Sequence, residues 1–275
     1  MITFPNCKIN LGLNIVARRA DGYHLLETAF YPVPLTDVLE IVPAAGNATT
    51  LTCYGRPVDC PPEKNLVMKA YRLLEDRYGL PPVDIHLTKV IPDGAGLGGG
   101  SADAAFTLRT LNEMFDLNLS KEELAAMAVT LGADCPFFIY NTPMMAGGIG
   151  DVLEPLHLSL AGKTLLLVKP ERSVATARAY AGVTPRPAER CLADDLSRPI
   201  GQWRETIKND FEQSVFQALP ELADVKRALY DNGAIYAAMS GSGSALFGIF
   251  DSDVLASRAC DKMAITDKFV LPLTV

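Results

Sequence analysis

The sequence predicts an α+β protein, and its length allows two domains. Its 275 residues, 49% of them hydrophobic, suit one large domain or two modest ones with well-developed cores. The C-terminal part has the order α-β-β-α-β, which is typical of helices on one face of an antiparallel sheet. The N-terminal part combines half-buried strands with a glycine-rich loop that leads into a helix.

The first predicted element is a strand at residues 9–15. Ile9, Leu11, Leu13 and Ile15 alternate with polar or small residues, so Lys8 and Asn10 emerge on one face. From the pattern alone, the main alternative for these two side chains is a solvated strand face. Further strands are expected near residues 25–33, 38–42 and 50–54.

A helix follows the Pro61-Pro62 pair and ends at Gly79. Its apolar positions run from Leu66 to Leu74, and Asn65 reads as a cap or first-turn residue. Residues 83–88 then alternate with period 2, as in a half-buried strand.

The glycine-rich loop from Pro92 to Ser101 has five glycines in seven residues. Helical spacing follows from Ala104 to Phe115, with Ser101 as the expected N-cap. Glycine permits positive φ and close approach to a ligand. Loop N–H groups and the positive end of the helix dipole would form an anion site, and phosphate is the usual anion.

Three interpretations of this loop compete. It could be a plain connection, although five glycines are costly there. It could be a dinucleotide loop, since Gly94 to Gly99 fits G-x-G-x-x-G, but a Rossmann strand reads as a continuous apolar run. The third is a triphosphate loop other than Walker A, because no Gly-Lys-[Ser/Thr] follows at the required spacing.

The next helix begins with a capping box formed by Ser120 and Glu123, and Gly132 is its expected stop. Asp134 is then the only charged residue between positions 129 and 140. On pattern alone it could equally be the N-cap of a short helical turn at residues 135–140.

The C-terminal half begins with a strand at residues 165–168 and a short helix from Ser173. A proline-containing surface loop is expected at residues 184–199. Helices are expected at 202–216 and 221–231, then strands at 235–239 and 245–250. These strands flank Ser240-Gly241-Ser242-Gly243-Ser244, which could be a hairpin turn. A helix at 253–263 and a strand at 269–275 end the chain.

Composition and charge exclude some classes of binding partner and indicate the cellular compartment. The formal net charge is −7 and no basic run occurs, which argues against nucleic acid or an anionic membrane. Six scattered cysteines, no signal peptide and no 18-residue apolar run predict a reduced, cytoplasmic protein. The three histidines are too dispersed to predict a metal site.

The loop Pro-x-x-Ala-Gly-Leu-Gly-Gly-Gly-Ser resembles the ATP-phosphate loop of the GHMP kinase superfamily. This resemblance implies an N-terminal ATP-binding domain like the second domain of ribosomal protein S5, at residues 1–152, and a ferredoxin-like domain at 153–275. It implies an adenine pocket at Asn65, Leu66 and Lys89. It also implies ATP binding along the loop, at Pro92, Asp93, Gly94, Ala95, Gly96, Leu97, Gly98, Gly99, Gly100, Ser101 and Ala102.

The segment Arg19-x-Asp21-Gly22-Tyr23-His24 is similar to a signature of particular GHMP kinases. These kinases phosphorylate the 2-hydroxyl of a cytidine diphosphate-linked methylerythritol in the non-mevalonate isoprenoid pathway. The resemblance implies substrate contacts by Asn10, Asp21, Tyr23 and His24, with the Tyr-His pair at the cytosine. Tyr180 aligns with a further aromatic residue on the cytosine, and its rival interpretation is a core or surface tyrosine.

Two motifs of the resemblance carry the chemistry. Lys8-Ile9-Asn10-Leu11 resembles the family's first motif, and the segment 131–138 resembles the one that holds its catalytic aspartate, here Asp134. The resemblance implies that Asp134 accepts the hydroxyl proton and that Lys8 keeps it ionised. ATP and Mg²⁺ are the expected cofactors, and Ser101 is the hydroxyl expected near the ion.

The expected partner is the small-molecule substrate, and the expected assembly is a monomer or weak homodimer. Two rival functions stay open: another GHMP kinase, such as a homoserine or mevalonate kinase, and a non-catalytic nucleotide-binding regulator. The segment from Arg19 to His24 argues against the first rival, and retention of both Lys8 and Asp134 argues against the second.

Overall fold

The computed structural model describes residues 1–275 and divides them into two compact units. Unit 1 comprises Met1–Cys7, Leu35–Asp93 and Gly98–Asn141, and unit 2 comprises Lys8–Pro34, Gly94–Leu97 and Thr142–Val275. Each unit combines helices with β-sheet, so the predicted α+β class is confirmed. Residues 8–34 belong to unit 2 because β3 (His24–Thr36) pairs antiparallel with β7 (Met144–Gly147). The units therefore do not follow a single cut in the sequence, and the domain boundary at residues 152 and 153 stays a prediction.

Unit 1 is built on a four-stranded sheet in the order β1-β4-β6-β5. Only the β5–β6 pair is parallel. Burial alternates along β6, as its sequence pattern predicted, because one face of the strand meets the core. The bounds are β1 (Ile2–Thr3), β4 (Val38–Pro43), β5 (Thr50–Gly55) and β6 (Val83–Lys89).

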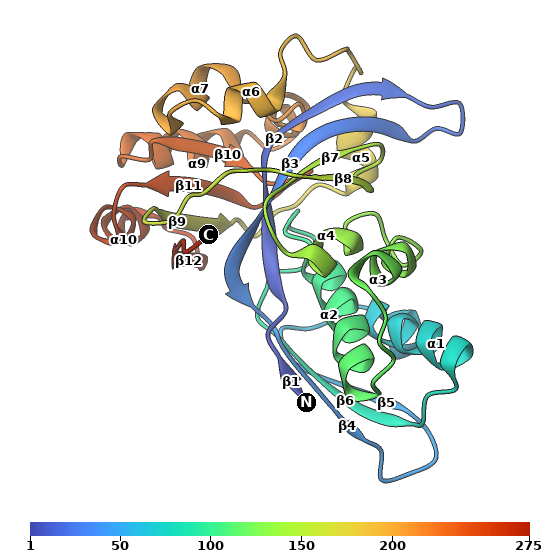
Figure 1. Ribbon diagram of the computed structural model, residues 1–275. Coiled ribbons are helices and arrows are strands. Elements are labelled where there is room, and N and C mark those ends of the chain that lie inside the picture. The colour runs from blue at the N-terminus through green and yellow to red at the C-terminus, as the bar shows by residue number, and fades with distance from the viewer. The chain divides into compact units, whose positions relative to one another are not determined.

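Helices complete unit 1, with α1 and α2 packed together (Figure 1). Asn65 caps α1 by accepting a hydrogen bond from the Val67 N–H, and Gly79 ends that helix at φ 67°. Ser120 and Glu123 form the predicted capping box at α3. The bounds are η1 (Pro62–Lys64), α1 (Leu66–Tyr78), α2 (Gly99–Met114), α3 (Lys121–Ala128) and α4 (Cys135–Tyr140).

Unit 2 contains an antiparallel sheet in the order β10-β11-β9-β12. Strand β9 reads Leu-Leu-Leu-Val at its centre and is buried there, because β11 and β12 pair with it on either side. With α9 and α10 this part has the predicted α-β-β-α-β order. The bounds are β9 (Thr164–Lys169), α9 (Pro220–Asp231), β10 (Tyr236–Met239), β11 (Leu246–Phe250), α10 (Asp253–Lys262) and β12 (Asp267–Pro272).

A second sheet of unit 2 has the order β2-β3-β7-β8. Its strands are β2 (Asn6–Arg18), whose first two residues fall in unit 1, β3, β7 and β8 (Val152–Pro155). The remaining helices of unit 2 are α5 (Thr176–Ala181), α6 (Leu192–Leu196), η2 (Ile200–Gln202), α7 (Trp203–Thr206) and α8 (Phe211–Ala218).

Three predictions for unit 2 were wrong in detail. The expected loop at 184–199 contains the helix α6, whose Leu192 and Leu196 are buried. The expected single helix at 202–216 is two helices, because Asn209 forms a parallel bridge with Leu13 of β2 between them. The helix expected from Ser173 begins at Thr176.

One prediction for unit 1 was also wrong. Helix α3 ends at Ala128, with Val129 as its C-cap, four residues before the stop expected at Gly132.

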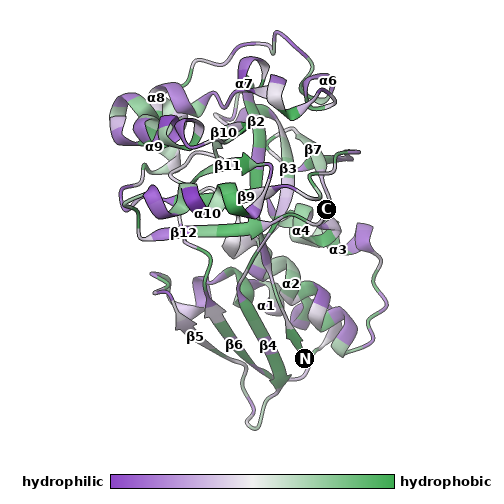
Figure 2. Cartoon of the chain, turned by 90° about the vertical axis from the view of Figure 1, so that its left-hand side faces the viewer, coloured by the Kyte–Doolittle hydropathy of each residue, from purple (hydrophilic) through white to green (hydrophobic).

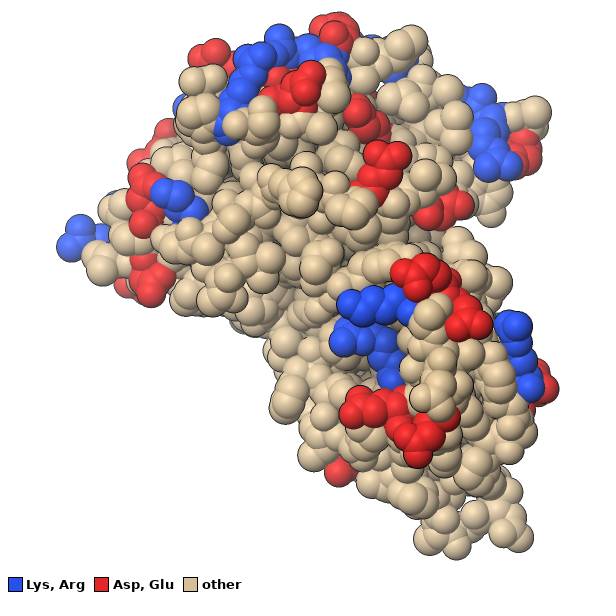
Figure 3. Space-filling view, in the orientation of Figure 1, with Lys and Arg blue, Asp and Glu red and all other residues tan.

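Hydropathy and charge follow these elements. Strand β4 is mostly green in Figure 2, whereas α10 alternates between purple and green residues, as a half-exposed helix does. On the face drawn in Figure 3, basic residues lie beside acidic ones rather than in one large basic stripe. None of the helices has both the length and the apolar character needed to cross a bilayer.

Candidate active site

The glycine loop combines left-handed turns with a helix start. Gly94, Gly96 and Gly98 have φ values of 59°, 77° and 71°, which side chains rarely adopt. Gly98 is the N-cap of α2, so the prediction that Ser101 caps this helix was wrong. Ser101 instead lies in the first turn of α2, where backbone N–H groups lack partners within the helix. This turn can therefore donate to an anion.

The N–H of Ala102 differs from those before it, because it donates to the Gly98 carbonyl at 2.8 Å. A phosphate bound by this N–H would have to break a helical hydrogen bond, and the Ala102 side chain is buried. The predicted contact of Ala102 with ATP stays a prediction.

Part of the loop is fixed by a second glycine-rich segment. Ser240 Oγ donates to the Gly96 carbonyl at 2.8 Å, and the Ala245 N–H donates to the Ala95 carbonyl at 3.1 Å. A Cβ atom on Gly96 would lie only 2.1 Å from the Ser240 carbonyl oxygen. Glycine is therefore required at position 96 by close backbone approach as well as by its φ value. The segment Ser240–Ser244 joins two antiparallel strands, so it is also the hairpin connection that the pattern allowed.

Lys8 and Asn10 project from β2 into a buried polar network. Lys8 Nζ donates to Asn10 Oδ1 at 2.7 Å, and Asn10 Nδ2 donates to Thr28 Oγ1 at 2.9 Å. Their side chains are 3% and 2% exposed, so the alternative of a solvated strand face was wrong. The Lys8 ammonium also lies 4.7 Å from the centre of the Phe30 ring, a cation–π contact. The Lys8 backbone N–H donates to the Leu97 carbonyl at 2.9 Å, which joins β2 to the glycine loop.

Asp134 precedes the short helix α4. It occupies the N-cap position, but its side chain makes no capping hydrogen bond. The N-cap interpretation is thus right for the position and wrong for the side chain. The next residue, Cys135, is buried, and burial raises the pKa of its thiol to about 11 although a hydrogen bond with Ser101 opposes this. The thiol is therefore neutral at physiological pH and packs as a small apolar group.

His24 and Tyr180 come from distant parts of the sequence and meet in unit 2. Their rings stack with centroids 4.9 Å apart and an interplanar angle of 26°. Tyr180 also meets Phe211 edge to face at 4.8 Å and packs against the core of unit 2. Tyr180 therefore packs partly against the core of unit 2 and partly against the His24 ring. Because the two rings face each other, a base could stack only on an outer face of this pair.

The turn between β2 and β3 is closed by its own residues. Asp21 Oδ1 accepts the Tyr23 N–H at 3.1 Å, and Asp21 Oδ2 pairs with Arg19 at 2.7 Å. Tyr23 is 61% exposed. Asp21 therefore has a local role in shaping the turn, and its contact with a substrate stays a prediction, as does that of Tyr23.

A groove of about 450 Å³ lies in unit 1 beside the start of α1. Asn65 lines it, together with residues of β5 and of the segment after it. The lining residues are Leu51, Cys53, Tyr54, Gly55, Arg56, Pro57, Val58, Cys60, Pro62 and Asn65. Leu66 lies nearby, 3.9 Å from the point where a Cβ on Gly100 would stand. The groove has the mixed apolar and polar lining of a small-molecule site.

Lys89, which was predicted to contact adenine, is bound to two buried carboxylates. Its ammonium donates to Asp37 Oδ2 and, at 2.6 Å, to Asp103 Oδ2. Burial opposes the charge, but the two carboxylates outweigh it and raise the pKa of Lys89. A direct bond from this ammonium to a base would have to displace a carboxylate, so its adenine contact stays a prediction.

Sequence reasoning did not select several residues that support these groups. Thr28 receives the Asn10 amide, and Asn209 Nδ2 donates to the carbonyls of Met239 and Gly241, each at 2.8 Å. Asp37 and Asp103 hold Lys89. One signal was available: Asp103 is the only charged residue between Ser101 and Leu108, as Asp134 is in its own segment.

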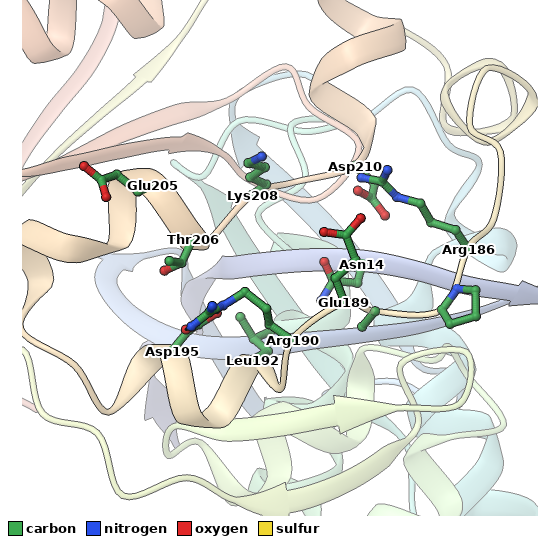
Figure 4. Close-up of a pocket in the computed structure, with 12 residues that line it drawn as sticks. Asn14, Arg186, Glu189, Arg190, Leu192, Asp195, Glu205, Thr206, Lys208 and Asp210 are labelled. Carbon is green, nitrogen blue, oxygen red and sulfur yellow. Dashed lines mark hydrogen bonds and ion pairs between the residues drawn. The ribbon is translucent and has the colours of Figure 1, made fainter.

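A separate polar cavity of about 160 Å³ lies in unit 2 (Figure 4). Asn14 of β2 and residues of α6 and α7 line it, with the Arg190–Asp195 ion pair at 2.5 Å on its wall. None of the predicted site residues lines this cavity.

Two family profiles match the chain. The profile described as GHMP kinases N terminal domain matches residues 65–142, and the one described as GHMP kinases C terminal matches residues 192–267.

Curated relatives match nearly the whole chain. A Parabacteroides distasonis protein named 4-diphosphocytidyl-2-C-methyl-D-erythritol kinase is 55% identical over 251 residues, covering 91% of this chain and 92% of that protein. A Porphyromonas gingivalis protein of the same name is 49% identical over 271 residues, covering 98% and 97%.

Solved structures of kinases resemble this chain over its whole length. A crystal structure described as 4-(cytidine 5'-diphospho)-2C-methyl-D-erythritol kinase has 33% sequence identity and a TM-score of 0.82, with both chains covered completely. An L. major mevalonate kinase has 16% identity and a TM-score of 0.73, covering 100% of this chain and 96% of that one, and so shares the fold.

Proposed function

Since the chain belongs to the 4-diphosphocytidyl-2-C-methyl-D-erythritol kinases, within the GHMP kinase family, we propose that it transfers the γ-phosphoryl group of ATP to the 2-hydroxyl of 4-diphosphocytidyl-2-C-methyl-D-erythritol. The products are the 2-phosphate and ADP, and the reaction belongs to the non-mevalonate pathway to isopentenyl diphosphate. The observation that carries this proposal is the identity of about one half to relatives of that name, over more than nine-tenths of the chain.

ATP binding is divided between two features of the chain. The triphosphate lies along the glycine loop, where the N–H groups of the first turn of α2 and the positive end of the helix dipole favour negative charge. The adenine lies in the groove lined by Asn65, with Leu66 and Lys89 beside it. The structure supports this role with the left-handed glycines and the helix start at Gly98.

Asp134 and Lys8 are the proposed catalytic residues. Asp134 accepts the proton of the substrate hydroxyl, and Lys8 favours the ionised form of Asp134 and offsets charge on the phosphoryl group. An opposite charge within ~4–6 Å lowers a carboxylate pKa by roughly 1–3 units. A strong base is not needed, because phosphoryl transfer depends mostly on positioning and electrostatics. The buried bond from Lys8 to Asn10 supports a fixed orientation of the ammonium.

Substrate recognition is assigned to Asn10, Asp21, Tyr23, His24 and Tyr180. The stacked rings of His24 and Tyr180 support a cytosine site, because base and aromatic faces stack favourably. Asn10 would meet the methylerythritol part of the substrate beside Lys8.

Mg²⁺ accompanies ATP in this proposal. The structure holds no group of three or more acidic, histidine or cysteine side chains that could form a protein cage. Mg²⁺ commonly keeps several waters and takes most other ligands from substrate phosphates. The residues present fit such a site, and the Ser101 hydroxyl, in the first turn of α2, would be its protein ligand. The ion would neutralise phosphate charge there.

The wider setting is part of the same proposal. The ATP-binding domain would be residues 1–152 and the second domain residues 153–275. The enzyme would act in the cytoplasm as a monomer or weak homodimer. Its six free thiols support a reducing compartment.

The first test is ADP release with Mg-ATP and four acceptors: 4-diphosphocytidyl-2-C-methyl-D-erythritol, mevalonate, phosphomevalonate and homoserine. Turnover with the cytidyl compound alone is the expected result. Turnover with another acceptor would overturn the substrate assignment. ATP binding without turnover of any acceptor would favour a regulator of the same fold.

A further inference from the structure

We propose that Asp37, Lys89 and Asp103 form a buried clasp that closes the neck of the glycine loop and positions it for ATP. The clasp makes Asp37 and Asp103 positioning residues, and it gives Lys89 a role beyond an adenine contact. This inference rests on the proposed ATP site, and its members all belong to unit 1.

The clasp joins the two ends of the loop. Lys89 is the last residue of β6, three positions before Pro92, and Asp103 is the fifth residue of α2. The bond of 2.6 Å from Lys89 Nζ to Asp103 Oδ2 links residues 14 apart. Because the ends of a chain segment lose freedom when they are linked, the loop between them samples fewer conformations.

Asp37 fixes the first side of the neck. Its Oδ1 accepts the N–H groups of Val90 and Ile91 at 2.5 and 2.8 Å, while Oδ2 accepts from Lys89. Asp37 thus bonds to three consecutive residues directly before the loop. Lys89 Nζ also lies 3.4 Å from the point where a Cβ on Gly99 would stand, so the ammonium borders the first residue of α2.

The charges of the clasp do not balance when both carboxylates are ionised. One cation then faces two anions, with Asp37 0%, Asp103 2% and Lys89 7% exposed. Asp103 Oδ1 is buried and has no hydrogen-bond partner. Burial raises the pKa of Asp103, and Asp37 adds to the rise while Lys89 opposes it. The protonated form of Asp103 is therefore favoured by its surroundings.

This charge state matters to a nearby triphosphate. With Asp103 protonated the clasp is neutral, and with Asp103 ionised it carries one negative charge beside the loop. ATP should therefore bind more weakly as pH rises through the raised pKa of Asp103. The groups that face Asp103 are Lys89 from β6, Asp37 before β4 and Cys53 from β5, whose thiol pKa is raised mainly by burial and further by Asp103.

The decisive variant is Asp103→Ala, because it cuts the link to α2 and leaves the Lys89–Asp37 pair neutral. We expect the Kd for Mg-ATP, measured by calorimetry, to rise about tenfold, the usual value of one hydrogen bond to a charged group. The KM for the cytidyl substrate should change less than about threefold. Asp103→Asn should restore ATP affinity, since the amide oxygen can accept the same bond, and should remove the pH dependence. Glu113→Ala, an exposed carboxylate on the same helix, is the matched control.

Three results would overturn the clasp. One is an unchanged Kd for Mg-ATP in Asp103→Ala, and another is an equal loss of affinity for both substrates, which indicates general destabilisation. The third result concerns Asp103→Asn, which serves as the test if Asp103→Ala does not fold. The clasp is overturned if the ATP affinity of Asp103→Asn depends on pH in the same way as that of the wild type. Calorimetry needs no turnover, so failure of the proposed phosphoryl acceptor would be seen separately in the ADP-release assay.

Discussion

Replacement of Gly96 by alanine tests whether the loop geometry, rather than glycine content, determines activity. Gly96 has φ 77°, and its Cβ would lie 2.1 Å from the Ser240 carbonyl oxygen. An alanine in this conformation costs roughly 1–2 kcal/mol. In addition, the two backbones must separate by roughly 1 Å, because Cβ contacts under 3.0 Å essentially never occur.

The separation also breaks the bond of 2.8 Å from Ser240 Oγ to the Gly96 carbonyl, worth about 1 kcal/mol. A misplacement of ~1 Å in a positioning element costs up to ~10²-fold in rate. We therefore expect Gly96→Ala to lower kcat/KM for ATP by roughly 10²-fold while the protein stays folded. The assay is ADP release over a range of ATP concentrations, with circular dichroism to confirm folding.

Gly94→Ala is the matched comparison, since Gly94 has φ 59° but no atom within 4 Å of the added Cβ. It carries the same backbone strain without the clash, so its kcat/KM should fall by less than about tenfold. Ser240→Ala removes the hydrogen bond to the Gly96 carbonyl and a longer one of 3.5 Å to Asn10 Oδ1, without a clash, and should cost about fivefold. Equal effects of Gly94→Ala and Gly96→Ala would refute the reasoning, because the close approach would then have no consequence.

Three other outcomes are expected. Asp134→Asn should lower kcat by ~10²–10⁴ with little change in ATP affinity, because it removes the proposed general base; kinetics within a few-fold of wild type would reject Asp134 as the base. Tyr180→Leu should raise KM for the cytidyl substrate by roughly tenfold through lost stacking, with the KM for ATP as the internal control. Arg190→Gln should lower the Tm at pH 7, since a hydrogen bond with Arg190 lowers the pKa of the buried Asp195. A folded pKa below the unfolded one adds stability above about pH 4 that is lost on acidification, so the Tm difference should shrink below pH 4. A constant difference across pH would show that the pair contributes no linkage.

The sequence alone determined the elements whose signals are local. Alternation predicted β2 and β6, the Ser120–Glu123 box marked the start of α3, and Gly79 marked the end of α1, because each depends on residues a few positions apart. The glycine loop was recognisable for the same reason. Its five glycines lie within seven residues, which predicts positive φ values and a phosphate-binding site. The kinase family and its cytidyl substrate were also predicted from short motifs, above all the segment from Arg19 to His24.

The tertiary structure decided what depends on distant residues. The buried Asn10 bonds to Thr28 and Ser240, and the need for glycine at 96 arose from a backbone 144 positions away. The expected helix at 202–216 was divided because Asn209 pairs with Leu13, which local propensity cannot reveal. Lys89 met Asp37 from 52 residues away. Contacts of this kind outweigh local preference because burial and hydrogen bonding are satisfied by whichever groups the fold brings together.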